Sequence, residues 1–165
     1  MDPQALLTQW VEAYSDPLLR TCFLSLGDRA LAEDAVQDTF IKAWRALGRM
    51  ADDPTHEKAW LMRIALNTCR DYRRGQWFRH VDIRQALEEL PPRLIAVEPE
   101  EHTLAMAVCA LPERFRQIIW LYYDQNLTVE EMSQALSLPK STAHKRLKRA
   151  QQLLRQQLQG GKNHE

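Results

Sequence analysis

The chain has 165 residues, with 45% hydrophobic and 27% charged side chains, which is ordinary for a soluble globular protein and excludes a largely disordered chain. No apolar run reaches the roughly 18 residues that a membrane-spanning helix requires, and residues 1–4 lack the basic and apolar parts of a secretory signal, so we expect a cytoplasmic protein without membrane insertion. The 22 basic and 22 acidic side chains cancel to a net charge of zero.

Hydrophobic residues recur at helical spacing through most of the first 75 residues. After a first helical segment, Gly27 and Asp28 are typical of a helix end followed by a new N-cap. A second helix is predicted for about 29–47, with an apolar face made of Val36, Phe40, Ala43, Trp44 and Leu47. A third is predicted for about 57–74, after a loop over 48–55, and its buried stripe consists of Trp60, Leu61, Ile64, Ala65, Thr68 and Tyr72.

Residues 75–99 interrupt this pattern. They contain Gly75 and three prolines, and residues 80–102 carry six acidic side chains against two arginines. This composition predicts a linker with one short helix at 82–90. The sequence therefore predicts an all-α fold of two small helical domains, residues 1–79 and 100–158, joined by a flexible acidic linker at 80–99 and followed by a frayed tail at 159–165.

Helical periodicity returns at about residue 100. Pro112 suits the first position of a helix, and Asn126 lies where a helix end needs a left-handed residue. Thr128 and Glu131 form a capping box before a short amphipathic segment, and residues 137–139 form a tight break. A longer helix follows, with its apolar side at Ala143, Leu147, Ala150 and Leu154.

A short helix, a turn and a cationic second helix make the plan of a helix-turn-helix. Residues 140–155 contain six basic side chains and no acidic one. Side chains on the first turns of this helix can donate to phosphates and to purine edges in a major groove. We predict that they bind DNA: Lys140, Ser141, Thr142, His144, Lys145, Lys148 and Arg149.

The third predicted helix carries a second cationic surface opposite its apolar stripe. Four side chains spaced by four, three and four residues form one line: Arg63, Asn67, Arg70 and Arg74. Arginine suits phosphate, and asparagine can bond a base edge in two places. Trp60 and Tyr72 are expected in the core, whereas Trp77 and Phe78 suit either the core or stacking on unpaired bases.

The second predicted helix has a different polar surface. Side chains off its apolar face include Glu33, Asp34, Gln37, Asp38, Lys42 and Arg45. An acidic face would repel DNA, so it is expected to contact water or a protein.

Three stretches resemble bacterial sigma factors. Residues 32–44, AEDAVQDTFIKAW, resemble region 2, where core RNA polymerase docks. Residues 60–67, continuing to 71–74, resemble the promoter-melting helix of that region, and residues 111–154 resemble region 4, the helix-turn-helix that reads the upstream promoter element. Only the acidic linker stands between these two regions, and this layout is similar to that of the extracytoplasmic-function (ECF) group. The resemblance covers about residues 5–75 and 100–157.

This resemblance implies that the protein is a sigma factor that binds core RNA polymerase and promoter DNA, with an anti-sigma factor as a further partner. The polymerase-binding residues would be Glu33, Asp34, Gln37, Asp38 and Lys42. Asn67 and the loop 52–58 would hold a base flipped from the minus-ten element, and Arg63, Arg70 and Arg74 would hold its backbone. The full minus-ten set would be His56, Lys58, Arg63, Asn67, Arg70 and Arg74. The helix 140–155 would enter the major groove of the minus-thirty-five element.

The sequence leaves two other functions open. The chain could be a stand-alone helix-turn-helix regulator, with residues 1–80 as a dimerisation or sensing domain. It could also be a helical metalloenzyme, but its five histidines and the cysteines Cys22, Cys69 and Cys109 show no metal-ligand spacing. We therefore expect no catalytic residue, metal or cofactor, and reduced thiols packed between helices.

Overall fold

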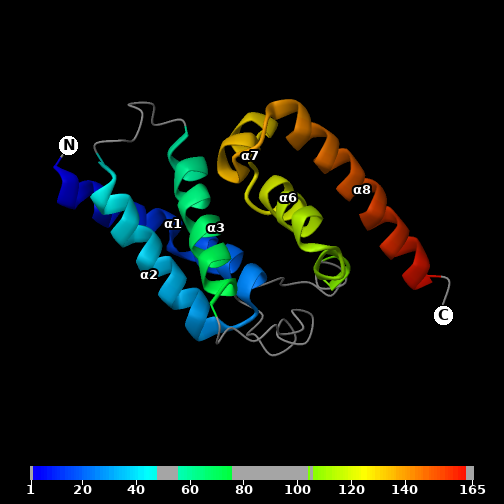
Figure 1. Ribbon diagram of the computed structural model, residues 1–165, viewed down its shortest axis with the longest axis horizontal. Coiled ribbons are helices and arrows are strands. Elements are labelled where there is room, and N and C mark those ends of the chain that lie inside the picture. Colours follow the sequence, from blue (N-terminus) through cyan, green and yellow to red (C-terminus); the bar gives the residue numbers. More distant parts are fainter. Residues whose placement is uncertain (1, 48–55, 76–103, 105, 163–165) are drawn as a thin grey trace. The chain divides into compact units, whose positions relative to one another are not determined.

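A computed structural model of the chain shows two compact helical units (Figure 1). It describes residues 2–47, 56–75, 104 and 106–162. The first unit contains α1 (Pro3–Leu26), α2 (Arg29–Arg45) and α3 (Glu57–Arg73). The second contains α6 (Glu113–Tyr123), α8 (Lys140–Lys162) and most of α7 (Val129–Leu136).

The predicted all-α architecture of two domains is confirmed, since the described residues contain helices and no strand. The predicted linker at 80–99, its short helix and the loop at 48–55 lie outside the described residues, as do Trp77 and Phe78. The domain limits at 79 and 99 therefore stay predictions. Where the frayed tail was expected, α8 continues to Lys162, because extending an existing helix is easier than starting one, even across glycine.

The junction between α1 and α2 forms as the sequence predicts. Gly27 adopts a left-handed φ of 70°, and its N–H donates to the Phe23 carbonyl at 2.8 Å. The Asp28 carboxylate then accepts from the Leu31 N–H at 3.0 Å. Such an N-cap stabilises a helix by about 1 kcal/mol. Two adjacent residues, Gly27 and Asp28, therefore end one helix and begin the next.

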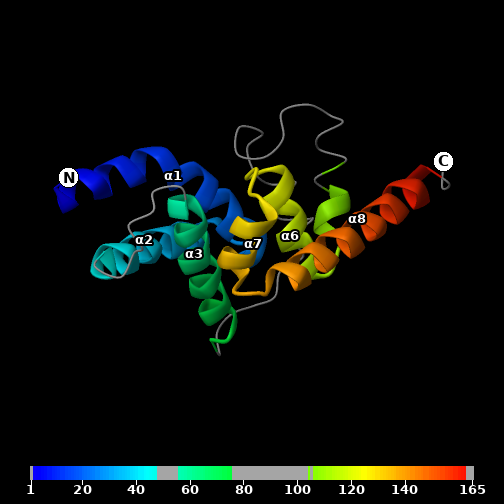
Figure 2. The same ribbon diagram turned by 90° about the horizontal axis from the view of Figure 1, so that it is seen from above.

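The three helices of the first unit lie side by side in both views (Figures 1 and 2). α1 contributes the fully buried Trp10 and Leu18, and α2 contributes three fully buried alanines, Ala32, Ala35 and Ala43. Their small side chains let the neighbouring backbones approach closely. Trp44, which the sequence places on the apolar face of α2, is 40% exposed.

The buried side of α3 is also turned from the predicted stripe. Leu61, Ala65 and Thr68 are buried as expected, but Trp60, Ile64 and Tyr72 are only half-buried. The remaining buried residues on α3 are Ala59, Met62, Leu66 and Cys69. At about 100° per residue, these positions move the centre of the buried side by roughly one residue position.

In the second unit, local capping again follows the sequence. The Thr128 hydroxyl accepts from the Glu131 N–H at 3.1 Å, and the Glu131 carboxylate accepts from the Thr128 N–H at 3.0 Å. Asn126 has the expected left-handed φ of 57°. Pro112 is the N-cap residue of α6, one position before the helical place predicted for it.

The break between α7 and α8 is a turn at Ser137, whose φ is 55°. The Leu138 N–H donates to the Ser133 carbonyl at 2.9 Å and closes the end of α7. α8 then packs on α6 through its predicted apolar side, and all four members of that side are buried: Ala143, Leu147, Ala150 and Leu154. The second unit therefore has the helix, turn and helix that the sequence predicts.

Candidate functional site

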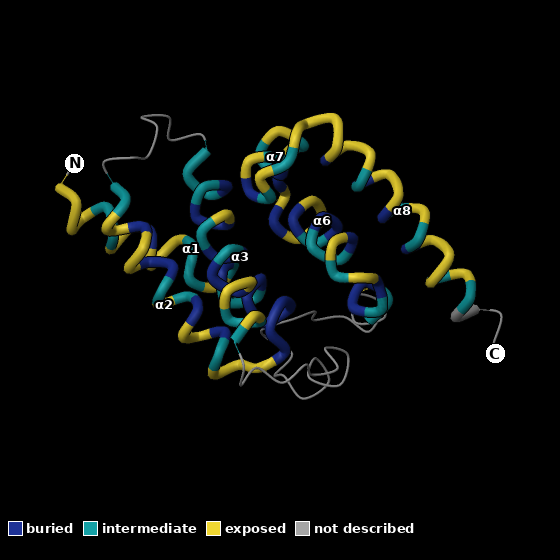
Figure 3. The backbone as a smooth tube through the Cα atoms, viewed as in Figure 1, coloured by how far each residue is buried: buried dark blue, intermediate teal, exposed yellow. Residues whose placement is uncertain are grey.

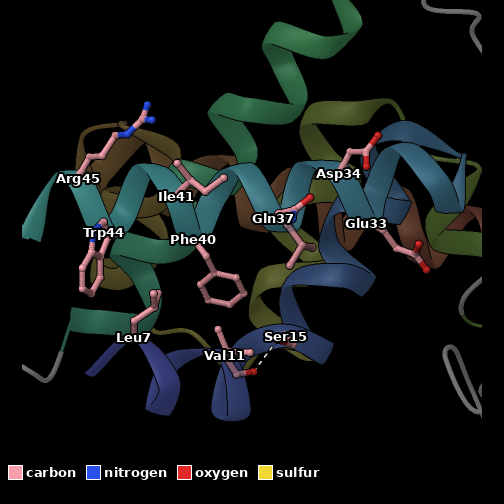
Figure 4. Close-up of a pocket in the computed structure, with 11 residues that line it drawn as sticks. Leu7, Val11, Ser15, Glu33, Asp34, Gln37, Phe40, Ile41, Trp44 and Arg45 are labelled. Atoms are coloured by element: carbon pink, nitrogen blue, oxygen red, sulfur yellow. Dashed lines mark hydrogen bonds between the residues drawn. The ribbon is translucent and has the colours of Figure 1, made fainter. Parts of the chain in front are cut away.

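The outward face of α2 combines acidic and apolar side chains beside a groove. α1 and α2 line this groove, and Ile41 and Trp44 stand on it with 42% and 40% of their surface exposed. In Figure 4, Phe40 points from α2 towards Val11 of α1, whereas Glu33 and Asp34 lie at the opposite end of the row from Arg45. An exposed apolar patch rimmed by charge is typical of a protein-binding surface.

Of the five residues predicted to bind polymerase, three lie on this face. Glu33, Asp34 and Gln37 are exposed and line the groove. Asp38 and Lys42 instead lie towards α3. The Tyr72 hydroxyl donates to the Asp38 carboxylate, and Lys42 Nζ donates to Thr68 Oγ1 at 2.9 Å.

The cationic line on α3 forms as predicted. Arg63, Arg70 and Arg74 are exposed, Asn67 is half-buried, and all four lie away from the buried side of the helix. Arg70 Nη2 donates to Asn67 Oδ1 at 3.1 Å, so the guanidinium orients the amide. The arrangement offers several cationic donors around one amide, which suits a nucleic acid backbone with a base edge beside it.

The start of α3 is fixed to α1 by contacts that the sequence did not reveal. The Glu57 carboxylate accepts from Trp10 Nε1 and, at 3.0 Å, from the Tyr14 hydroxyl. Burial, this hydrogen bond and the Glu57 charge raise the pKa of Tyr14 to about 12. The rings of Trp10 and Trp60 lie 5.7 Å apart at 56°.

These contacts lie at the start of α3, at the end of the loop to which the sigma-factor resemblance assigns base binding. His56 and Lys58 flank Glu57 at the start of α3, and both are half-buried. Loop residues 52–55 lie outside the described part of the chain. Trp10 and Glu57 are 47 residues apart, so no local pattern predicts their contact. The sequence indicates only that Trp10 lies on an apolar helix face and that Glu57 stands at the start of a helix.

A buried pair of thiols is a second feature that the sequence did not reveal. Cys22 of α1 and Cys69 of α3 are fully buried and hydrogen-bonded to one another. The bond from Cys22, with Ser25 and the charges of Arg73 and Lys42, lowers the pKa of Cys69. The same bond and burial raise the pKa of Cys22. The pair fills the core at the contact between α1 and α3.

One side of α8 is exposed along its length (Figure 3), and its first turns carry several basic residues on that side. All seven predicted DNA-binding residues are exposed: Lys140, Ser141, Thr142, His144, Lys145, Lys148 and Arg149. Arg149 Nη1 donates to Gln152 Oε1 at 3.3 Å on the same helix. Because the buried alanines and leucines hold the opposite side, these side chains are available to a ligand.

Comparison with known proteins decides between the functions left open by the sequence. Residues 10–79 match Sigma-70 region 2, and residues 107–156 match Sigma-70, region 4. A relative, the ECF RNA polymerase sigma-E factor of Salmonella typhimurium, is 31% identical over 140 residues, covering 76% of this chain and 73% of that protein. The chain belongs to the sigma-70 family. It is an ECF-type sigma factor, a protein that directs promoter-specific initiation of transcription.

Two further similarities cover most of this chain and most of the protein to which it is similar. The ECF RNA polymerase sigma factor SigW of Bacillus subtilis is 29% identical over 162 residues, covering 90% of this chain and 86% of that protein. The solved structure of CnrH in complex with the cytosolic domain of CnrY has a TM-score of 0.67 and 29% identity, covering 95% of this chain and 90% of that chain.

The region 2 match includes α2, α3 and α1 from residue 10 onward, and the region 4 match includes α6, α7 and α8 as far as residue 156. A stand-alone helix-turn-helix regulator is not favoured, because it would account for the second match only.

None of the helices in the described ranges has the length and apolar character that a membrane span requires.

Proposed function

We propose that this sigma factor binds core RNA polymerase through the outward face of α2. The support is the combination of exposed Glu33, Asp34 and Gln37 with the exposed apolar side chains of Ile41 and Trp44. Tryptophan in a patch that a partner covers contributes strongly to binding, and the acidic rim favours a basic partner surface.

The cationic line on α3 is the proposed minus-ten surface. Arg63, Arg70 and Arg74 bind the phosphate backbone, and Asn67 binds a base edge. His56 and Lys58, at the start of α3, complete this set and lie beside the loop expected to capture a flipped base. Flipping costs a few kcal/mol of lost stacking, which backbone and pocket contacts offset.

The exposed side of α8 is the proposed minus-thirty-five surface. Its first turns enter the major groove, where Arg149 reads a base edge and Lys145 contacts phosphate. The sigma factor thus performs no covalent chemistry. Its selectivity arises because one promoter must satisfy two DNA surfaces at a fixed spacing.

The observation that carries this proposal is the separation of charge among faces. Acidic and apolar side chains share the outward face of α2, whereas the exposed sides of α3 and α8 are cationic. A protein partner and a DNA partner therefore meet different surfaces. We also propose a cytoplasmic location, the domain limits given above and an anti-sigma partner, the last because CnrH was solved with a bound protein, CnrY.

The test is reconstitution. The purified chain is titrated against core RNA polymerase and assayed for transcripts from a promoter library with duplex templates. We expect a stable complex and initiation at promoters that share two elements at one spacing. Specific duplex binding by the chain alone, with no effect of added polymerase, would show a stand-alone regulator instead.

A further inference from the structure

Among the described residues, side-chain hydrogen bonds join α2 to α3 at two levels, which lie one turn apart on each helix. The Tyr72 hydroxyl donates to Asp38, and Lys42 Nζ donates to Thr68 Oγ1 at 2.9 Å. The partners are four residues apart on both helices and run in opposite order. They therefore form successive rungs between antiparallel helices, because residues four apart lie above one another on a helix face. We call Asp38, Lys42, Thr68 and Tyr72 the α2–α3 ladder.

Each rung has a consistent arrangement of donors and acceptors. Thr68 is buried, and its hydroxyl donates to the Ile64 carbonyl at 2.8 Å, which leaves its oxygen to accept from Lys42. Burial, the bond to Asp38 and the Asp38 and Asp34 charges raise the pKa of Tyr72, so its hydroxyl keeps the proton that it donates. A hydroxyl bound to a carboxylate makes a stronger bond than two neutral groups do.

The ladder lies on the side of α3 away from the cationic line. At about 100° per residue, Tyr72 lies roughly 160° from both Arg70 and Arg74, although it stands between them in the sequence. The Tyr72 bond can therefore fix the rotation of the last turn of α3 without covering either arginine. It fixes that turn to α2, the helix whose outward face is the proposed polymerase surface.

We propose that Tyr72 is a positioning residue for promoter opening, and that Asp38 and Lys42 hold α3 in place rather than contact polymerase. This inference rests on the proposed function of α2 and α3. The sigma-factor resemblance assigns five side chains to polymerase binding. The inference gives two of them, Asp38 and Lys42, a role inside the first unit instead.

The first test is Tyr72→Phe, which keeps the ring and removes only the hydroxyl. We expect the yield of open complexes on a duplex promoter to fall roughly three- to tenfold, as for loss of one hydrogen bond. Affinity for core polymerase stays within about twofold, since the outward face of α2 is untouched. Normal promoter opening by this variant overturns the inference.

A double-mutant cycle separates positioning from a general loss of stability. Arg74→Ala and Tyr72→Phe should be strongly non-additive in open-complex yield, because Tyr72 acts by placing the last turn that carries Arg74. Tyr14→Phe is the matched control. It removes a tyrosine–carboxylate bond at the other end of α3 and should add independently to Arg74→Ala.

The outcomes of the cycle are distinct. Additive effects of Tyr72→Phe and Arg74→Ala overturn this inference alone. Normal opening by Arg74→Ala overturns the proposed minus-ten role of α3, and the inference with it.

Substitutions at Asp38 keep the test decisive if Tyr72→Phe fails to fold. Asp38→Asn retains an oxygen that accepts from Tyr72 but removes the charge, so we expect normal polymerase affinity and nearly normal opening. Asp38→Ala removes the acceptor and should lower opening while leaving polymerase affinity unchanged. If Asp38→Asn instead weakens polymerase binding as much as Asp38→Ala does, Asp38 is a docking residue and the inference is wrong.

Discussion

Asp34 and Asp38 stand one turn apart on α2, yet their carboxylates have different surroundings. Asp34 is exposed on the groove face, whereas Asp38 is half-buried and accepts a hydrogen bond from Tyr72. The sequence places both off the apolar face and cannot distinguish them, because Tyr72 is 34 residues away. A substitution at Asp34 therefore tests polymerase docking without removing the hydrogen bond between α2 and α3.

Asp34→Arg should weaken binding to core polymerase about tenfold, or roughly 1.4 kcal/mol, by reversing a charge at a complementary surface. Its free energy of unfolding should change by less than about 0.5 kcal/mol, as is usual for an exposed position. Asp38→Arg is the contrasting variant, and it should lower the free energy of unfolding by about 1–3 kcal/mol because it leaves the Tyr72 hydroxyl without its acceptor. The measurements are a polymerase titration and a denaturant melt. Unchanged affinity for Asp34→Arg would contradict the proposed docking surface.

Asn67 is the one amide among the arginines of the cationic line, and Arg70 orients it. Asn67→Ala should impair promoter opening more than initial promoter binding, at a cost of about 1–3 kcal/mol for one lost base contact. Opening is measured by the yield of open complexes, and closed binding by competition. A premelted template should partly restore the variant, since the base then needs no flipping. An unchanged yield on duplex DNA would remove this role from Asn67.

At the scale of whole elements, the sequence predicts capped helix ends better than the faces of α2 and α3. Helix ends depend on neighbouring residues, so the caps at Gly27 and Asp28 and the Thr128–Glu131 box could be identified directly. The faces of α2 and α3 depend on which partner covers them. Trp44 belongs to the apolar face that the sequence predicts for α2, but the fully buried apolar residues of this helix are the three alanines, and Trp44 is 40% exposed.

The sequence predicts the buried side of α8 correctly because α8 packs mainly through a single apolar row, which the charged residues around it make plain. α3 is harder, since it contacts both α1 and α2 and its buried side includes Thr68 and Cys69 as well as aliphatic residues. The ladder and the Trp10–Glu57 contact join residues that no local pattern connects. The candidate surfaces could therefore be predicted, but the contacts that fix them could not.

Two exposed positions on α8 should differ in what they read. Arg149→Ala should relax preference at one or two upstream base pairs, by about 1–3 kcal/mol, because the guanidinium fork suits the paired acceptors of guanine. Lys145→Ala should weaken binding evenly across sequences. Neither should disturb folding, since the buried row lies on the other side of the helix. A promoter library scored for both variants is the measurement. If neither changes preference or affinity, α8 is not the DNA reader.

Across the whole molecule, a net charge of zero conceals strong segregation. The chain has 22 bases and 22 acids, yet the proposed DNA surfaces of both units are cationic, and acidic side chains gather on α2 and in the 80–102 segment. Affinity for a polyanion depends on the local surface rather than the sum. A DNA partner should therefore release counterions from both units when it binds.

This gives a prediction of how strongly each unit contributes to DNA binding. In the complex with core polymerase, Arg74→Ala in the first unit and Lys145→Ala in the second should each reduce the slope of log affinity against log salt by about one, and the double variant by about two, because each removes one phosphate contact. Arg29→Ala is the control, since Arg29 pairs with Glu33 on α2 at 3.1 Å and should leave the slope unchanged. The measurement is promoter binding at several salt concentrations. If Lys145→Ala lowers the slope but Arg74→Ala does not, only the second unit holds DNA, and the first has another role.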